Sequence, residues 1–429
     1  MTKSTETKLD HDQVTQRIKD SLTKRHRSER IFRGLGFSAV VLGFLLVFFL
    51  LFDISHKAFP AFHQHWVVVD INFDEDWLGY EEGKAIESLR FRNTLRKSIA
   101  ENFPEVTGRR DKRQLYALYS TNAEFRIRQH LIDNPTDIGK TVPIMVLADD
   151  DVDVYLKEDP APGEPLIRID EKEAKLVQKL NDQGRIVKRF NFEFFQNGDS
   201  REPELAGVRG ALTGTLLTML VTLILSFPLG VAAALYLEEF APKNKWTDMI
   251  EVNINNLAAV PSIIFVLLGL AVIINMFGLP RSAPLVGGIV LTLMTLPTII
   301  IASRASIKAV PPSIREAALG LGASKVQTAF GHVLPMAMPG ILTGTIIGLA
   351  QALGETAPLL MIGMVAFIVD IPGGVTDPST VMPVQIFLWA DSPERGFLAK
   401  TSAAIVVLLG FLFVMNATAA YLRRRFEKS

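Results

Sequence analysis

The sequence contains no cysteine among its 429 residues. This absence excludes disulfide bonds, cysteine-ligated zinc, iron–sulfur clusters and thiol nucleophiles. It does not indicate a compartment, because a cysteine-free domain is stable on either side of a membrane. The sequence also lacks an excess of charge of either sign, with 45 Lys and Arg against 45 Asp and Glu. A nucleic-acid binder needs a basic excess to neutralise phosphates, so we expect no nucleic-acid partner.

Long stretches of the chain have almost no charged residues. Hydrophobic residues make up 48% of the sequence although 21% is charged, so the apolar residues are gathered into separate segments. Five charge-free runs and one run with a single charge cover residues 35–52, 211–237, 257–279, 282–303, 333–369 and 401–422. A bilayer core takes about 20 apolar residues as helix, and lipid offers the backbone no hydrogen bonds. The sequence therefore predicts six transmembrane helices; a buried core helix could explain one such run but not six.

The first run is interpreted as an anchor helix, residues 35–52, after a cytoplasmic segment, residues 1–34. A signal peptide fits less well, since the run is too long for an h-region and no A-x-A site follows. Residues 1–34 contain nine Lys and Arg, and residues 423–428 contain four. By the positive-inside rule both termini are then cytoplasmic, in agreement with an even number of spans.

About 150 polar residues, 53–207, separate the first two runs. Residues 53–205 contain 22 Lys and Arg against 29 Asp and Glu, which excludes a strongly basic surface. Residues 65–73 and 142–147 are predicted as strands, and residues 84–103 and 171–181 as helices. We therefore expect an all-α polytopic membrane protein with an α+β extracytoplasmic insertion, residues 53–207, before a membrane core, residues 208–429.

Two short motifs are considered and rejected as ligand sites. NPTDIGKT, residues 134–141, lacks the leading glycine of a phosphate-binding loop, so we expect no nucleotide site in this chain. DDDVD, residues 149–153, lacks the glycine and distal glutamate of a calcium loop and is predicted to be a solvated turn. The seven His are scattered, so no metal site is expected.

A loop on the cytoplasmic side, residues 310–335, reads VPPSIREAALGLGASKVQTAFGHVLP. Two prolines end one helix and start another, and Ser313 and Glu316 have the spacing of a capping box. Ile314, Ala317, Ala318 and Leu321 are predicted to share one face of this short helix, which Gly320 and Gly322 end. A second helix is expected to begin near Ser324, and Pro335 to close the loop. These features indicate either a docking element for a cytoplasmic partner or an ordinary connecting loop.

The same loop resembles the EAA loop of ABC importer permeases, E-A-A-x-x-x-G-x9-I-x-L-P. The matching residues here are Glu316, Ala317, Ala318, Gly322, Leu334 and Pro335, while His332 stands where the motif has isoleucine. The resemblance implies that the loop, with Arg315 beside the motif, fits a groove on an ATPase subunit and transmits its closure to the membrane helices.

The fifth run carries one acidic residue, Glu355, within GLAQALGETAPLLMIG, residues 348–363. A carboxylate in mid-span costs at least about 2.5 kcal/mol and is expected to face a bundle interior or a water-filled path. Gln351 is predicted one helical turn away on the same face. We predict that Glu355, Gln351 and Thr356 line a translocation path; the alternative is a structural Glu355 paired with a cation of a neighbouring helix.

Residues 207–429 resemble the PstA type of phosphate ABC importer permease. The resemblance rests on GETAPLL, on residues 259–270 (AVPSIIFVLLGL) and on residues 228–242 (PLGVAAALYLEEFAP). The anchor and insertion before that core resemble a longer variant of the same subunit. Family members often have an Arg one turn before GETAPL, where this chain has Gln351, so no cation is expected there.

This resemblance implies an ABC importer type I permease core in the inner membrane. Its implied partners are a second homologous permease subunit, two ATPase subunits and a periplasmic phosphate-binding protein. No cofactor is expected in this chain, since ATP and Mg²⁺ are bound by the ATPase, and the chain is not itself an enzyme. A permease for another oxyanion such as sulfate, or for polyamines, stays open, as does a membrane sensor with an outer receptor domain.

Overall fold

The computed structural model describes residues 11–427, except 82, 159–168, 276 and 365–366. The chain divides into two compact units, residues 1–56 and residues 57–429. The first unit consists of the long helix α1 (His11–Ala58), which continues into the first residues of the second unit. The predicted anchor, residues 35–52, lies inside α1, and its side chains are exposed. The candidate span covers Arg25–Phe62.

Residues 57–208, called the insertion below, contain a three-stranded antiparallel sheet in the order β2-β1-β3. The strands are β1 (His63–Asn72), β2 (Thr141–Leu147) and β3 (Ile186–Phe190). Alternate residues Val67, Val69 and Ile71 of β1 are buried, as expected for a strand with one face on a core. The described helices of the insertion are α2 (Glu75–Leu78), α3 (Phe91–Asn102), α4 (Arg109–Ala117), α5 (Ala123–Asp133), α6 (Asp150–Glu158), α7 (Glu171–Asp182) and α8 (Glu193–Gln196).

The structure confirms both predicted strands and the helix at residues 171–181, and it corrects three local predictions. The helix expected over residues 84–103 begins only at Phe91, because the N–H of Arg90 bonds to the Leu78 carbonyl at 2.9 Å and holds the preceding residues off the helix. Strand β3 was not predicted; its last three residues are exposed at the sheet edge, so its sequence shows little alternation. The acidic run 149–153 is not a solvated turn, since it leads into α6.

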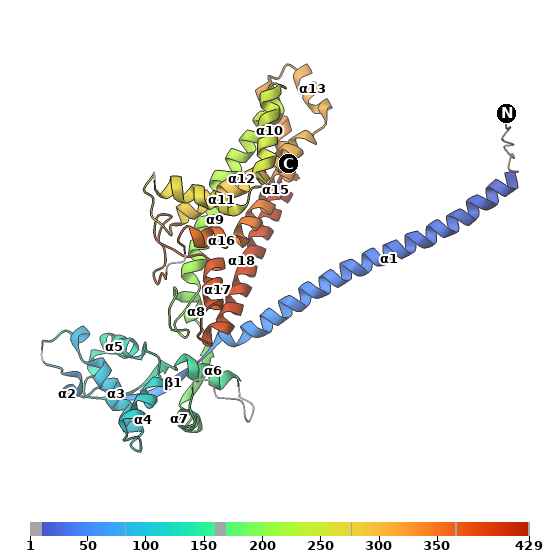
Figure 1. The fold of residues 1–429 in the computed structure, drawn as a ribbon. Helices are drawn as coiled ribbons and strands as arrows, with labels where there is room; N and C mark the ends of the chain where they lie inside the picture. Colours follow the sequence, from blue (N-terminus) through green and yellow to red (C-terminus); the bar gives the residue numbers. More distant parts are fainter. Residues whose placement is uncertain (1–10, 82, 159–168, 276, 365–366, 428–429) are drawn as a thin grey trace. The chain divides into compact units, whose positions relative to one another are not determined.

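The membrane core follows the insertion. Its helices are α9 (Arg209–Leu235), α10 (Lys245–Leu257), α11 (Ser262–Leu268), α12 (Pro284–Lys308), α13 (Pro312–Gly320), α14 (Lys325–Thr328), α15 (Leu334–Gly354), α16 (Ala357–Met361), α17 (Met382–Ala390) and α18 (Gly396–Glu427). Within the described residues, five helices including α1 are long and apolar enough to cross a membrane, and six if one bent pair counts as a span. The chain is therefore a multi-pass membrane protein with an α+β insertion, as predicted (Figure 1).

The bent pair corrects the predicted third span, residues 257–279. Helices α10 and α11, with the π-helical turn Gly269–Ile274, meet at an angle of 104° across a short break that ends at Pro261. A residue before proline is pushed out of the helical region, which ends the first helix. The segment Ser262–Ile274 has 13 helical residues and extends about 20 Å, less than the roughly 30 Å of a bilayer core. The apolar run is therefore one arm of a broken or re-entrant element.

Small residues bring the long helices together. A β-carbon placed at Gly288 of α12 would lie 2.5 Å from Val221 of α9, and one at Gly344 of α15 would lie 2.2 Å from Ala302 of α12. Membrane helices gain little from apolar burial alone and associate through such close approaches. The hydroxyl of Thr222 bonds to the Gly288 carbonyl at 3.3 Å across the same contact. Helix α12 is thereby fixed between α9 and α15.

Candidate functional site

The predicted path residues lie at a helix break. Helix α15 ends at Gly354, Glu355 has an extended backbone with φ −79° and ψ 103°, and α16 begins at Ala357. Pro358 has no N–H to continue the ladder from α15, which accounts for a break at this point. Glu355 and Thr356 are half-buried, and Gln351 is exposed. Glu355 therefore lies just after the end of α15 and not in the middle of a continuous helix, so the prediction that it shares one helical face with Gln351 does not hold.

Within the part of the chain that the structure describes, the side chain of Glu355 has no cationic partner. Among the residues that the structure describes, none forms an ion pair or hydrogen bond with its carboxylate. The structural alternative, a Glu355 paired with a Lys or Arg of a neighbouring helix, is thus not found here. Broken helices with polar residues at the break are the usual form of ion and substrate sites in transporters. The path role of Glu355, Gln351 and Thr356 stays a prediction.

A small cavity lies next to the break. It measures about 10 Å³ and is lined by residues of α9, α12, α15 and α16, among them Thr215, Thr218 and Leu359. The hydroxyl of Thr218 is buried there without a hydrogen-bond partner. A volume of this size holds about one water molecule. The cavity cannot hold a larger solute.

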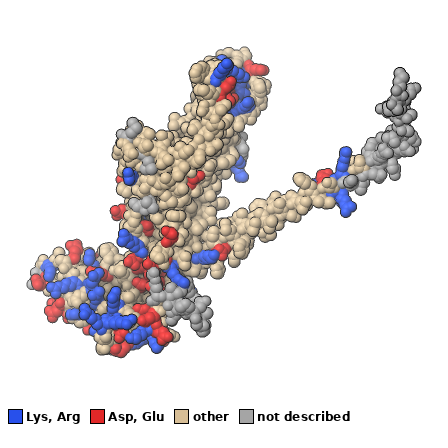
Figure 2. Space-filling view, in the orientation of Figure 1, with Lys and Arg blue, Asp and Glu red and all other residues tan. Residues whose placement is uncertain are grey.

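At the end of the helix bundle where α13 lies, charged side chains of both signs gather (Figure 2). Arg315 of α13 donates to the Val310 carbonyl at 2.7 Å and to the Ile307 carbonyl at 2.9 Å. The same guanidinium donates twice to Oε1 of Glu239, at 2.9 and 2.8 Å. Glu239 belongs to the π-helical turn Tyr236–Phe240 after α9. Arg315 therefore attaches α13 to the end of α12 and to the end of α9.

A second arginine extends this cluster. Arg304 of α12 donates to Glu238 at 2.8 Å and pairs with Glu251 of α10 at 2.5 Å. The two guanidinium groups and the carboxylates of Glu238 and Glu239 are largely withdrawn from solvent, which makes these pairs costly to break on one side only, whereas Glu251 is 37% exposed. We call Arg304, Arg315, Glu238, Glu239 and Glu251 the arginine–glutamate cluster. It joins the ends of α9 and α12, the middle of α10 and the first turn of α13 into one connected unit.

The predicted coupling residues lie on α13 or just after it. Ala318 is buried, whereas Glu316 and Ala317 are exposed. Gly322 has φ +88°, a backbone conformation that favours glycine, and it directs the chain away from the helix end. Leu321 is 90% exposed and follows the last helical residue, Gly320, so the prediction that it shares a helical face with Ala318 is wrong. The coupling role of these residues stays a prediction.

Two further expectations about this loop are corrected. Pro312 occupies the first helical position, so Pro311 is the N-cap and Ser313 lies inside α13, where no capping box forms. The capping box is instead made by Ser324 and Gln327 at the start of α14. Pro335 does not close the loop. A helix runs from Lys325 to Gly354 and accommodates this proline next to the π-helical turn Ala329–Val333.

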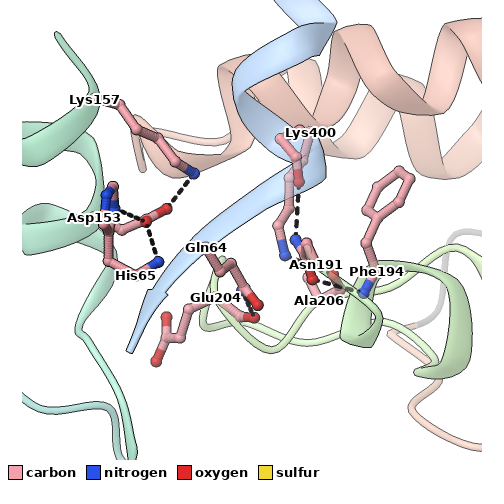
Figure 3. A network of polar contacts seen from close by, with 10 residues as sticks. Gln64, His65, Asp153, Lys157, Asn191, Phe194, Glu204, Ala206 and Lys400 are labelled. Atoms are coloured by element: carbon pink, nitrogen blue, oxygen red, sulfur yellow. Dashed lines mark hydrogen bonds and ion pairs between the residues drawn. The ribbon is translucent and has the colours of Figure 1, made fainter. Parts of the chain in front are cut away.

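A buried polar network joins the insertion to the last helix (Figure 3). Lys400 of α18 is buried and donates to the Ala206 carbonyl at 2.7 Å. Gln64 of β1 donates to the Glu204 carbonyl at 2.5 Å, and the Glu204 carboxylate accepts from Ser120, also at 2.5 Å. Burial raises the pKa of Glu204, although the Ser120 hydrogen bond opposes that shift. The residues of this network are up to 194 positions apart in sequence, and sequence reasoning did not identify them.

The second half of the network is centred on Asp153 of α6. Its carboxylate accepts from the backbone N–H of His65 and contacts the His65 ring, both at 2.9 Å, and it pairs with Lys157. Burial alone raises the pKa of Asp153, but the hydrogen bond from His65 and the charge of Lys157 outweigh it and hold the pKa low. Two sequence signals belonged to this network: Asp153 in the acidic run 149–153, which was interpreted as a solvated turn, and Lys400, a cation directly before the last apolar run.

Two family models match the chain. Residues 210–428 match the binding-protein-dependent transport system inner membrane component, and residues 19–162 match a domain of unknown function, DUF3333. The probable ABC transporter permease protein YqgI of Bacillus subtilis is 33% identical over 256 residues, which cover 54% of this chain and 83% of that protein.

Two phosphate transport system permease proteins are also similar. PstA 1 of Mycobacterium tuberculosis is 32% identical over 51% of this chain and 70% of its own length. PstA of Yersinia pestis is 30% identical over 50% of this chain and 71% of its own length. The first family model covers half of the sequence and contains both the helix break and the arginine–glutamate cluster. The chain therefore belongs to the family of binding-protein-dependent transport system inner membrane components, the permease subunits of ABC importers.

Proposed function

We propose that this chain is a permease subunit of an ATP-driven phosphate importer. The observation that carries the proposal is its similarity, at 30–32% identity, to phosphate permeases of two bacteria over about half of this chain. The GETAPLL segment that suggested phosphate coincides with the break between α15 and α16. The proposal therefore places substrate recognition at this break, where Glu355 stands.

The chemistry of the break suggests how two subunits share the substrate. Phosphate is a mixture of monoanion and dianion near neutral pH, since its second pKa is about 6–7. Glu355 offers a carboxylate, and the chain presents Gln351 rather than a cation one turn earlier. The second permease subunit then supplies Arg or Lys to hold phosphate. Glu355 accepts hydrogen bonds from the protonated anion and weakens binding enough for release.

Energy enters through α13. In the proposal, Glu316, Ala317 and the exposed end of α13 at Leu321 fit a groove on one of two ATPase subunits, which bind ATP and Mg²⁺. Arg315 transmits the movement of α13 to α9 and α12, because it bonds to both. A phosphate-binding protein delivers substrate on the opposite side, and both termini lie in the cytoplasm. Covalent bonds are broken only in the ATP that the ATPase subunits hydrolyse.

The substrate is tested by uptake of labelled phosphate and labelled sulfate in cells that lack this gene and any redundant phosphate system. We expect selective loss of phosphate uptake, restored by the wild-type gene. Glu355→Ala is expected to lower the rate and alter its pH dependence, because it removes the carboxylate at the break. Unchanged phosphate uptake, or loss of sulfate uptake instead, would overturn the phosphate assignment while leaving the family intact.

A further inference from the structure

Aromatic side chains form a continuous exposed surface at one end of the insertion. We call Phe59, His63, Phe190, Phe192 and Phe195 the aromatic patch. Phe59 and Phe192 are each 62% exposed, Phe190 is 44% exposed and Phe195 is 40% exposed. Single exposed apolar residues are common on proteins, but a contiguous group of this kind marks an interaction surface.

The patch is preformed by four segments of the fold. The ring of His63 lies 5.3 Å from that of Phe59 and 6.3 Å from that of Phe190, its cross-strand partner in the sheet. The ring of Phe190 in turn lies 4.9 Å from Phe192 and 6.0 Å from Phe195, on which it stacks. The short turn Phe59–Phe62, the first residue of β1, strand β3 and helix α8 with its N-cap Phe192 thus contribute to one surface.

Hydrogen bonds beneath the patch hold these segments together. Asn191 donates its side-chain amide to the Ala61 carbonyl at 2.9 Å, and its side-chain oxygen accepts from the N–H of Phe194 at 3.0 Å. Figure 3 shows Asn191 and Phe194 beside the Lys400 contact to Ala206. The patch therefore needs no rearrangement before it meets a partner.

The level of the patch relative to the bilayer follows from its contacts. Phe194, which touches Phe195 at 5.0 Å between ring centroids, is buried in one cluster with Ala211 of α9 and Ala403 of α18. Both alanines belong to charge-free runs that must lie in hydrocarbon. The carbonyl of Phe194 also accepts from the N–H of Val208, one residue before α9 begins. The aromatic patch is thus held at the boundary where two spanning helices begin.

We propose that the aromatic patch rests in the headgroup region of the adjacent membrane leaflet and holds the insertion against the lipid surface. Aromatic rings are enriched at this depth, where apolar acyl chains lie on one side and water on the other. Lys188 and Arg189, which precede Phe190 in β3, are exposed and suit anionic headgroups. The aromatic patch is continuous with the spanning helices, and this favours lipid over a protein partner as what covers the patch.

The absence of cysteine makes a direct test simple, because every introduced cysteine is unique. Phe192→Cys in the full chain is labelled with an environment-sensitive fluorophore, and the protein is placed in nanodiscs with and without phosphatidylglycerol. Gln178→Cys, exposed on α7, is the matched control. Phe59→Cys is a second reporter in case the first variant does not fold.

At position 192 we expect a blue-shifted emission, strong quenching by a shallow lipid-attached quencher and a several-fold loss of iodide quenching relative to position 178. Phosphatidylglycerol is expected to increase the lipid quenching. Equal iodide quenching at both positions would overturn the proposal. Protection from iodide that arises only when partner subunits are present, without lipid quenching, would also overturn it and assign the patch to a protein partner.

Discussion

Asp149 and Asp150 are half-buried carboxylates at the start of α6, close to the network that joins the insertion to α18. Burial, followed by repulsion from Asp150 and Glu204, raises the pKa of Asp149 to about 8. Burial and repulsion from Asp151 and Glu204 raise that of Asp150 to about 7. The folded chain therefore binds protons that the unfolded chain has released, and the free energy of unfolding falls as pH rises from about 4 to about 8.

Asp149→Asn is expected to reduce this pH dependence, because the amide keeps a neutral side chain at all pH values. The side-chain oxygen of Asn can still accept the N–H of Asp151, which lies 3.2 Å from Oδ1 in the wild type. Apparent melting temperatures of the full chain in detergent, compared at about pH 6 and about pH 9, measure the effect. The variant should gain stability over the wild type at the higher pH.

Asp182→Asn is the control for this experiment, since Asp182 is exposed at the end of α7. It should leave the pH profile of the melting temperature unchanged. A wild-type protein that is more stable at the higher pH would contradict the assignment, as would an Asp149→Asn profile identical to that of the wild type.

At the scale of helices, the fold depends on close approach at glycine. A β-carbon at Gly214 of α9 would lie 2.1 Å from the backbone oxygen of Thr380, which cannot move aside as a side chain can. Gly214→Ala should therefore destabilise the full chain by about 1–3 kcal/mol or prevent its folding. The loss is read as a lower apparent melting temperature and a lower folded yield in detergent.

Gly410→Ala provides the matched control within α18. No atom lies within 4 Å of a β-carbon at that position, and alanine is a better helix former than glycine. The substitution should be neutral or stabilise the chain by up to about 1 kcal/mol. If Gly214→Ala and Gly410→Ala had equal effects, close packing of α9 against the segment before α17 would not be what the glycine provides.

The extent of sequence-based prediction differs between elements for physical reasons. The absence of charged residues identified the spanning segments, because lipid excludes charge whatever the tertiary contacts of a helix are. It did not show the bend at Pro261, since hydropathy does not distinguish a straight helix from a broken one. The break at Glu355 was missed in the same way, although Pro358 stands three residues after it. Strand β3 was missed because Lys188, Arg189 and Phe190 are exposed at an edge.

At the scale of the whole molecule, distant residues meet in ways that no local pattern reveals. The contacts of Lys400 with Ala206 and of Arg315 with Glu239 join residues 194 and 76 positions apart. The EAA-like residues could be recognised because a short motif carries them, whereas the glutamates that hold Arg315 in place lie outside that motif. Helix α13 is consequently one arm of a connected unit that includes the ends of α9 and α12 and the middle of α10.

The central claim is that force from an ATPase enters this permease through α13 and drives phosphate across the membrane. ATP-dependent uptake of labelled phosphate into proteoliposomes of the complete complex tests it most directly. Glu316→Lys places a cation on the exposed face of α13 and is compared with Asp248→Lys, an equivalent charge reversal on the exposed surface of α10. Wrong-sign charge in a docking interface costs several kcal/mol, so Glu316→Lys should reduce uptake on the order of tenfold or more.

Asp248→Lys should leave uptake near the wild-type rate, and both variants should reach the liposomes in equal amounts. Coupling through α13 predicts both results. Phosphate uptake by the Glu316→Lys complex at the wild-type rate would contradict it, because α13 would then carry no coupling.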